Sequence, residues 1–173
     1  MRASPDLIVL RREGLYCPAG DFHIDPWLPV PRAVITHGHA DHARAGMGEY
    51  HASAASLPIL RWRLGDQLVT AHDYGRTFEL GRARVSLHPA GHVLGSAQVR
   101  VEVDGQVWVA SGDYKRQLDP TCAAFEVVPC DTFITEATFA LPVYRWPEMR
   151  DVVDEIASWR AECESRGEAA VVF

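Results

Sequence analysis

The chain has 173 residues, of which 47% are hydrophobic and 23% are charged, and its formal net charge is −6. These proportions predict one globular domain with a sizeable core, and they exclude a disordered or fibrous chain. The apolar run after "MRASPD" has only four residues, too few for a signal peptide or a membrane span, so we expect a cytoplasmic protein with no membrane partner. The four cysteines are scattered without CxxC spacing, which predicts reduced thiols.

The N-terminal part of the chain predicts short strands followed by a helix. Turn signals separate the apolar, β-prone segments, and the last strand leads directly into a cluster of histidines. The strands are expected at residues 7–10, 14–17, 22–24 and 33–36. Residues 54–64 then carry leucines at helical spacing, with Ser56 as the N-cap and Pro58 in the first turn.

The middle of the chain gives the strongest local signal, a β-hairpin in "VRVEVDGQVWVA". Valines alternate with polar residues on both sides of Asp104-Gly105, a pair that suits a type I′ turn. Residues 133–136 predict another strand. Pro147 is expected to open a helix with an apolar stripe, and Gly167 to end it as a C-terminal cap.

The stretch "VITHGHADH", residues 34–42, places four ligand-type side chains within six positions. His37 and His39 are two residues apart, so their imidazoles can point to one side of an extended or tightly turned backbone and bind one cation. Asp41 and His42 follow where the chain can curl into a helix, which allows a second cation nearby. Two ions about 3.5–4 Å apart suit displacement at phosphorus or hydrolysis at a carbonyl. We therefore expect a paired-metal site rather than a solvated polar loop.

Two later segments offer further ligands. His92, in "PAGHVLGSA", lies between a strand at residues 85–87 and the hairpin, and its flanking glycines let the backbone approach a metal or a phosphate. Asp113, in "VASGDYKR", follows the hairpin, where a carboxylate could bridge both cations. Each alone could be an ordinary turn residue. The negative net charge by itself argues against a nucleic-acid partner, because phosphate binding usually needs a cationic surface. Two bound cations would add positive charge at the site and so weaken that argument.

At these positions the sequence resembles the metallo-β-lactamase fold. "THGHADH" resembles the HxHxDH motif, and Asp25 in "FHIDPW", His92 and Asp113 match the flanking motifs in the family's order. "AGHVLGSA" and "FITEATF" are similar to the β-CASP nuclease branch, and "SGDYKRQLDPTC" most resembles the bacterial ligase-associated DNA exonucleases, also described as mRNA 3′-end processing factor-like. The resemblance implies an α/β fold: part of an αββα metallo-β-lactamase sandwich over residues 1–140, and an incomplete β-CASP insertion over residues 141–173.

The resemblance also implies the roles of the candidate ligands. His37, His39 and His92 would hold a first metal, Asp41 and His42 a second, and Asp113 would bridge them. The ligand types favour zinc, with manganese as the alternative. Asp25 is expected to orient the histidine loop, because ligating imidazoles usually donate their other N–H to a carboxylate or carbonyl; a simple strand-end turn is the alternative.

Other polar residues are weaker candidates. Glu136 matches the acidic residue of the first β-CASP motif, which in the family supports a later histidine acting on the leaving group; a salt-bridged strand-end carboxylate is the alternative. Lys115 and Arg116 could contact a substrate phosphate or form a solvated basic turn. We expect structural or surface roles for the remaining histidines, which are His23, His51, His72 and His88. Of these, only His23 and His88 are weak candidates for the site.

No histidine follows His92 in the sequence. Family members continue for a comparable length beyond "AVVF", and that part carries the leaving-group histidine and the last ligand of the second metal. We therefore expect the N-terminal half of a nuclease or a shortened homologue, impaired by itself. The apolar run "AAVVF" at the end supports truncation, with a docked terminal strand as the alternative.

The reaction that these residues indicate is metal-assisted phosphodiester hydrolysis. Two cations would lower the pKa of a water molecule to about 7 and so supply hydroxide, and Asp41 would accept or orient its proton. The resemblance alone favours DNA over RNA and implies a role in DNA repair with ligase and helicase partners. An RNA-processing nuclease, a hydrolase of the same fold acting on a small ester or thioester, and a non-catalytic binding module are the alternatives.

Overall fold

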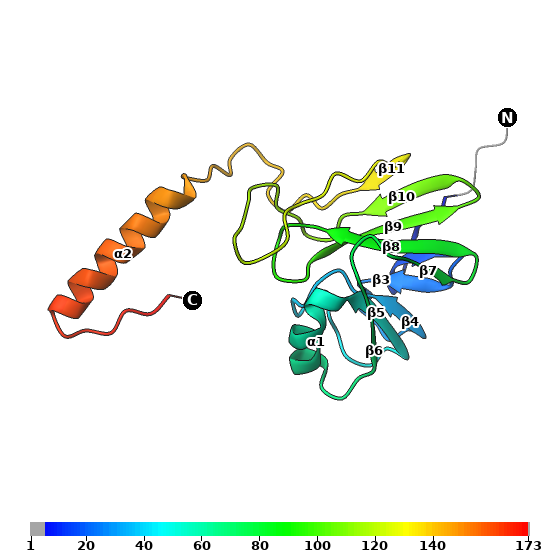
Figure 1. Cartoon of the computed structure of the whole chain (residues 1–173), viewed down its shortest axis with the longest axis horizontal. Helices are drawn as coiled ribbons and strands as arrows, with labels where there is room; N and C mark the ends of the chain where they lie inside the picture. The colour runs from blue at the N-terminus through cyan, green and yellow to red at the C-terminus, as the bar shows by residue number, and fades with distance from the viewer. Residues whose placement is uncertain (1–5, 173) are drawn as a thin grey trace. The chain divides into compact units, whose positions relative to one another are not determined.

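The computed structural model describes residues 6–172 and divides into two compact units, Met1–Glu136 and Ala137–Phe173. The first unit is built on two β-sheets (Figure 1). Sheet A has the strand order β1-β2-β3-β4-β5-β6, with β1 (Val9–Arg11), β2 (Gly14–Cys17), β3 (Phe22–Ile24), β4 (Arg32–Val34), β5 (Glu49–Ser53) and β6 (Val69–His72). Sheet B has the order β11-β10-β9-β8-β7, with β7 (Thr77–Leu80), β8 (Ala83–Pro89), β9 (Ala97–Val103), β10 (Gln106–Ala110) and β11 (Thr132–Ile134).

Strand direction brings the expected site residues to the same place. In sheet A, β3 to β6 run parallel to one another, and in sheet B, β11 runs parallel to β10. Ile24 pairs with Val34 at the ends of β3 and β4, so the residues that follow these two strands leave the sheet side by side. Asp25 and the histidine loop are those residues.

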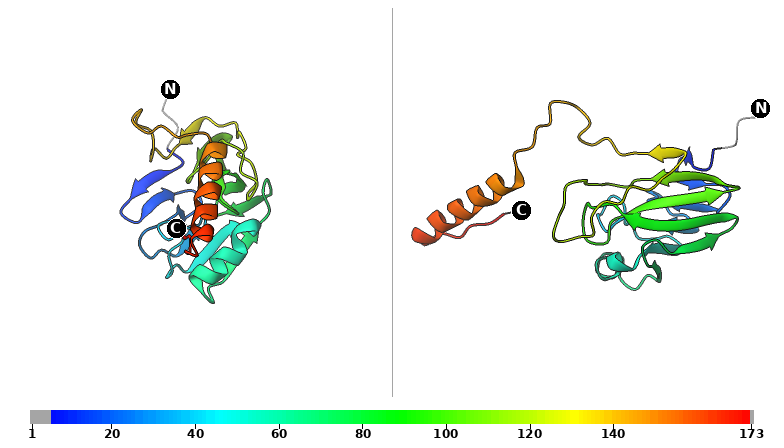
Figure 2. Two further views of the ribbon diagram at one scale, coloured as in Figure 1. Left: turned by 90° about the vertical axis from the view of Figure 1, so that its left-hand side faces the viewer. Right: turned by 45° about the horizontal axis from the view of Figure 1, so that its top comes forward.

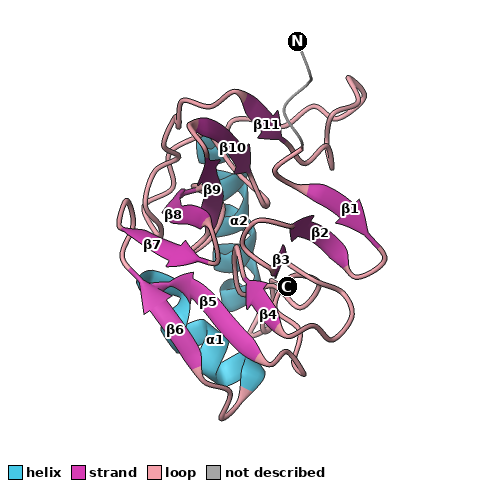
Figure 3. Ribbon diagram, turned by 90° about the vertical axis from the view of Figure 1, so that its right-hand side faces the viewer, coloured by secondary structure: helices cyan, strands magenta, loops and turns pink. Residues whose placement is uncertain are grey.

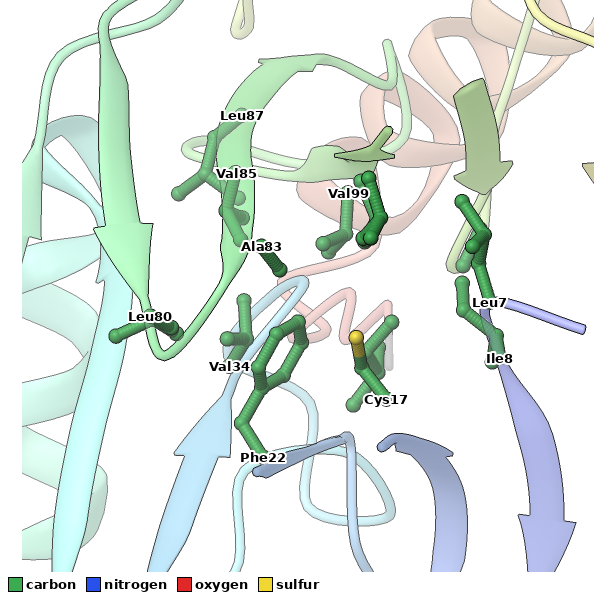
Figure 4. Close-up of a cluster of buried hydrophobic side chains, with 14 of the residues drawn as sticks. Leu7, Ile8, Cys17, Phe22, Val34, Leu80, Ala83, Val85, Leu87 and Val99 are labelled. Atoms are coloured by element: carbon green, nitrogen blue, oxygen red, sulfur yellow. The ribbon is translucent and has the colours of Figure 1, made fainter. Parts of the chain in front are cut away.

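A first apolar core fills the space between the two sheets. Phe22 and Val34 of sheet A meet Val85, Leu87 and Val99 of sheet B, and each of these side chains has no measurable exposure (Figure 4). The right-hand view of Figure 2 shows sheet B in front of sheet A. Burial of such side chains stabilises the fold by about 1.5–3 kcal/mol each, so this core fixes the two sheets against one another.

A second core lies between the other face of sheet A and helix α1 (Leu57–Leu64). Ala33 and Ile35 point toward Leu60 and Leu64, whereas Val34 between them points into the first core. This alternation is the period of two that a strand buried on both faces shows. Figure 3 shows α1 lying against β5 and β6. The described residues 6–136 therefore form helix, sheet and sheet layers.

The predicted helix over 54–64 is present, but its start differs from expectation. Residues Ala54–Ser56 form a 3₁₀ turn (η1) before α1 begins. The side chain of Ser53 accepts the hydrogen bond from the Ser56 N–H, while Ser56 itself has helical dihedrals and makes no side-chain cap bond. Ser56 thus occupies the predicted N-cap position of α1, while the side-chain cap lies three residues earlier, at the start of η1.

The predicted strands are largely confirmed. β2 and β3 have the expected bounds, and β9 and β10 form the hairpin around Asp104 (φ 50°) and Gly105 (φ 82°). These two positive φ angles are those of a type I′ turn. Three strands, β1, β4 and β11, begin and end one or two residues away from the predicted bounds. The bounds of a strand depend on how far the neighbouring strand pairs with it.

The second unit contains α2 (Met149–Ser165). The helix begins two residues after Pro147 and ends as predicted: Gly167 has φ 69°, and the Glu168 N–H donates to the Cys163 carbonyl at 2.9 Å, a Schellman arrangement. Residues 168–172 adopt no regular structure, so no docked terminal strand occurs among them. None of the helices in residues 6–172 has the length and apolar character needed to cross a bilayer.

Candidate metal centre

Four candidate segments converge at one edge of the two sheets. The histidine loop, defined as residues 36–44, follows β4, and Asp25 follows β3; His92 follows β8, and Asp113 follows β10. The histidine loop is closed by bonds from the N–H groups of His42 and Ala43 to the His39 carbonyl, at 3.2 and 2.8 Å. The segment after Asp41 is a turn rather than the start of a helix, since these bonds turn the chain once and do not continue.

Two glycines allow this convergence. A Cβ on Gly38 would lie 2.6 Å from Ile59 of α1, so the loop can rest against the helix only with glycine there. Gly112 has φ 55°, and a Cβ on it would lie 2.7 Å from the Cβ of Thr36. Glycine at both positions therefore brings Asp113 against the histidine loop.

One group of four donor atoms has the spacing of a metal's ligands. His39 Nδ1 lies 3.0 Å from His37 Nε2 and 3.3 Å from His92 Nε2. Asp113 Oδ2 lies 3.7 Å from both of these Nε2 atoms, and all four atoms lie within 4.8 Å of one another. Ligands 2.0–2.1 Å from a tetrahedral ion are about 3.3 Å apart. The donors fit a divalent cation of that geometry.

A second group shares Asp113. Its other carboxylate oxygen, Oδ1, lies 3.5 Å from His42 Nε2, which is also 3.6 Å from Asp41 Oδ2. Asp41 is 73% exposed at its side chain, whereas His42 is only 19% exposed. The structure therefore brings together all six residues that the sequence suggested as ligands, and it directs one Asp113 oxygen to each group.

Asp25 and Thr36 hold the imidazoles from behind. Asp25 Oδ1 accepts the Thr36 N–H at 2.8 Å, and its Oδ2 accepts the Thr36 hydroxyl at 2.5 Å and lies 2.7 Å from His42 Nδ1. Thr36 Oγ1 is in turn 3.0 Å from His37 Nδ1. Both histidines thus have Nδ1 engaged at the rear and Nε2 directed forward, which sets the ring orientation that ligation needs. Asp25, His37 and His42 are also close enough to form a ligand group. The hydrogen bonds described above, however, already occupy Asp25 Oδ2, His37 Nδ1 and His42 Nδ1.

The electrostatics of the group favour neutral imidazoles. Burial, reinforced by the neighbouring His42, His39 and His92, lowers the pKa of His37 to about 2. Burial also lowers the pKa of His92 and raises that of Asp113. His37 and Asp113 are therefore not an ion pair despite their separation of 3.7 Å. Burial opposes protonation of His42 too, but the hydrogen bond and charge of Asp25, together with Asp113 and Asp41, raise its pKa overall.

With this geometry in place, comparison with known proteins identifies the fold. A region of a probable DNA ligase from Opitutus terrae is 30% identical over 164 residues, which cover 92% of this chain and 16% of that protein. The endoribonuclease ysh-1 of Neurospora crassa is 35% identical over 146 residues, covering 62% of this chain and 17% of the relative. The chain has the metallo-β-lactamase/β-CASP nuclease fold.

Further comparisons agree on the extent of the match. The cleavage and polyadenylation specificity factor 73 of Drosophila melanogaster is 28% identical over 151 residues, covering 68% of this chain and 22% of the relative. A crystal structure of an Enterococcus faecalis protein of unknown function superposes with a TM-score of 0.54 at 12% identity, over 76% of this chain and 39% of that one. No protein-family model matches the chain. The chain thus spans less than a quarter of the length of these three named relatives.

Glu136 lies beside the candidate metal centre. Its Oε1 accepts the Tyr114 N–H at 2.9 Å, and its own N–H donates to the Ser111 hydroxyl at 3.2 Å. A cavity of about 270 Å³ is lined by Glu136, by metal-group residues and by apolar strand residues, among them Asp41, His42, Asp113, Ile24, Ala110 and Ile134. This cavity connects Glu136 with the second donor group.

The two basic candidates have other surroundings. Lys115 Nζ is bonded to Asp119 Oδ2 at 3.1 Å, in the same loop, so its charge is already partly balanced. Arg116 is exposed. The structure gives neither residue a contact with the six candidate ligands, and their role toward a phosphate stays a prediction.

The remaining histidines lie outside the two donor groups. His23 packs on the Tyr16 ring, with centroids 4.7 Å apart, and His88 bonds to Glu126 at 2.9 Å. His51 and His72 are bonded to one another at 3.0 Å. Each occupies a position in or beside a strand, and among the described residues none belongs to a group of three or more potential metal ligands.

Sequence reasoning missed three residues that hold the centre. Thr36 is buried and joins Asp25 to His37, and its position directly before the first histidine was the available signal. Ser96 accepts the N–H groups of His92 and Val93 at 3.1 and 3.2 Å. Arg63 of α1 donates from Nε to the Gly38 carbonyl, a contact that depends on how α1 packs and had no signal in the sequence.

Proposed function

We propose that the chain forms the metal-binding part of a nuclease that hydrolyses phosphodiester bonds, with DNA as its substrate. The carrying observation is Asp113, whose two oxygens face two separate groups of donors. A shared carboxylate between two cation positions is the arrangement that two-metal hydrolases use to act on a phosphate. The imidazole-rich first group favours zinc, with manganese as the alternative.

The residues of the chain have separable tasks in this reaction. Two bound divalent ions would supply hydroxide at neutral pH and offset charge on the phosphoryl oxygens. Asp41 is the exposed carboxylate of the second group, and it accepts or orients the proton of the attacking water. Glu136 accepts the Tyr114 N–H and lines the same cavity as Asp41 and Asp113, where it positions groups near the departing oxygen. No histidine of the 173-residue chain follows His92 to protonate that oxygen. We therefore expect weak turnover by this chain alone.

Support for DNA comes from the share of the chain that the relative named DNA ligase matches. Support for RNA comes from the relatives that are named endoribonuclease. The relative named probable DNA ligase matches 92% of the chain, against 62% for the ysh-1 endoribonuclease. The same match supports a DNA repair role with an exonuclease acting beside a ligase. RNA processing is the second candidate, because the relatives named endoribonuclease are up to 38% identical over shorter regions. A helicase partner remains an expectation from the resemblance, and a cytoplasmic location remains an expectation from the sequence.

The test combines metal content with cleavage. The 173-residue chain is loaded with zinc or manganese, its bound metal is measured by mass spectrometry, and it is given single-stranded DNA and RNA of one sequence labelled at either end. We expect two equivalents of metal and slow release of terminal nucleotides from DNA. Asp113→Asn should abolish cleavage and reduce bound metal to one equivalent or less.

Asp104→Asn is the matched control. Asp104 undergoes the same chemical change at the opposite end of β10, where its side chain is 86% exposed, and this variant should cleave and bind metal like the unmodified chain. Cleavage of RNA alone would replace DNA with RNA as the substrate. Two bound metals without cleavage of either polymer would refute the nuclease proposal, and binding of no metal would refute the centre itself.

A further inference from the structure

Helix α1 presents a cationic and aromatic surface beside the candidate metal centre. We define the α1 patch as Arg61, Trp62 and Arg63. Arg61 and Trp62 are exposed, Trp62 to 81%, although a large aromatic side chain normally gains by burial. Leu60 and Leu64 on the other side of the helix are buried against sheet A. Trp62 therefore takes no part in the packing of α1 on sheet A.

Arg63 connects the α1 patch to the histidine loop. Its Nε–H donates to the carbonyl of Gly38, the residue between His37 and His39. This bond uses one of the five guanidinium N–H groups. The guanidinium carbon lies 5.7 Å from the centroid of the Trp62 ring, within cation–π range. Arg44 donates from Nε to the Asp41 carbonyl of the same loop at 3.3 Å, so two guanidinium groups border the candidate ligands.

The arginines of this surface differ from several others of the chain in their ion pairing. Arg32, Arg84 and Arg100 each pair with a glutamate at 2.7–2.9 Å. Within residues 6–172, by contrast, Arg44, Arg61 and Arg63 form no ion pair with a described carboxylate. The chain as a whole carries a charge of −6. Arg44 and Arg63 at the histidine loop, together with Arg61 on α1, thus carry positive charge that no ion pair among the described residues offsets, on a chain that is acidic as a whole.

We propose that the α1 patch binds single-stranded nucleic acid and leads it to the metal centre, with Arg61 and Arg63 on phosphates and Trp62 stacked on a base. This combination of arginines with an exposed aromatic ring is what binding of single strands requires, since phosphates pair with cations and every base offers a face for stacking. The inference rests on the proposed function for the nature of the substrate. It adds the route by which a strand reaches the centre.

Binding is tested separately from cleavage. The zinc-loaded 173-residue chain is titrated into a fluorescein-labelled phosphorothioate oligothymidylate, and the dissociation constant is measured by anisotropy over a series of salt concentrations. Each lost phosphate contact should reduce the slope of log K against log salt by about 0.7. Arg61→Gln should show this reduction, and Arg61→Gln with Arg63→Gln about 1.4. Trp62→Ala should weaken binding about 5- to 150-fold at every salt concentration with the slope unchanged, and Trp62→Phe should restore most of it.

Arg82→Gln is the matched charge control. Arg82 lies at the opposite end of β8 from His92, about 20 Å away along a seven-residue strand, and its side chain is 76% exposed. Its replacement should leave the salt slope unchanged. If Arg63→Gln loses zinc through its contact with Gly38, Arg61→Gln and the Trp62 variants still decide the matter, because neither residue bonds to the histidine loop.

Several outcomes would overturn the inference. They are absence of oligonucleotide binding by the unmodified chain, an equal effect of Arg82→Gln, and equal competition by polyglutamate of the same charge, which would indicate an acidic protein partner. Binding that depends on the α1 patch without cleavage of DNA or RNA would support the inference and contradict the proposed nuclease. Cleavage that survives in α1 variants with unchanged binding would contradict the inference alone.

Discussion

Two groups of histidines lie on or directly after neighbouring strands of sheet A, and their ring nitrogens have different partners. His37, His39 and His42 follow β4, while His51 and His72 lie on β5 and β6. In the first group the forward nitrogens lie 3.0–3.7 Å from other donor atoms. In the second group His51 Nδ1 bonds to His72 and Nε2 bonds to Glu49, each at 3.0 Å.

The difference lies in what occupies the rear of each ring. Thr36 and Asp25 engage the Nδ1 atoms of His37 and His42 and leave their Nε2 atoms directed toward Asp113. The pair of His51 and His72 is closed by its own bonds and by stacking of His72 on Phe78, with centroids 3.5 Å apart. A high local density of histidine therefore does not make a metal site; a backing hydrogen bond and a carboxylate in front do.

The largest expected effect breaks the first group by one ligand. His39→Gln removes an exposed imidazole that is central to the first donor group, so the fold should stay intact while metal affinity falls by more than the roughly 100-fold typical of losing a supporting residue. His51→Gln is the matched control, with the same change on the neighbouring strand, and it should bind zinc normally. Competition with a chromophoric chelator measures both affinities. Equal zinc affinity in the two variants would remove the distinction between the groups.

A smaller effect should follow from changing the rear of the first group. Asp25→Asn keeps one acceptor oxygen for Thr36 but removes the carboxylate charge beside His42, and we expect metal affinity to fall about 10- to 100-fold. Asp21→Asn is the matched control, since both aspartates have positive φ, 44° and 50°, but Asp21 accepts from Tyr16 instead. If both variants bind metal equally well, the backing role of Asp25 is wrong.

The sequence was informative where a local pattern carried the structure. Alternating valines around Asp104-Gly105 predicted the hairpin, and Gly167 predicted the end of α2, because turn and cap geometry depend on residues near in sequence. The six candidate ligands could be named because their motifs lie at strand ends. Their assembly depends on strands that are distant in the chain but adjacent in the sheets.

Other features required the fold itself. Ser53 caps η1 only because the chain makes a 3₁₀ turn before α1, whereas the sequence indicated only Ser56. The contact of Arg63 with Gly38 joins residues 25 positions apart, through a packing of α1 on sheet A that no local pattern encodes. The supporting residues of the candidate centre were therefore harder to predict than its ligands, since their effect comes from tertiary packing.

The smallest expected effect concerns the second group and appears only with changing pH. Burial lowers the pKa of His51 below 6.5, with Glu49 opposing this and Arg32 adding to it. The unfolded chain then takes up the proton at a higher pH than the folded chain, so the free energy of unfolding decreases as pH falls below about 6.5. His51→Gln removes this titration, and its stability should decrease less over the same interval. Urea unfolding above and below pH 6.5, with chelator present so that metal release does not contribute, measures the difference.

A variant that loses as much stability on acidification as the unmodified chain would show that His51 is not held neutral by its surroundings. The two histidine groups would then differ in metal binding alone.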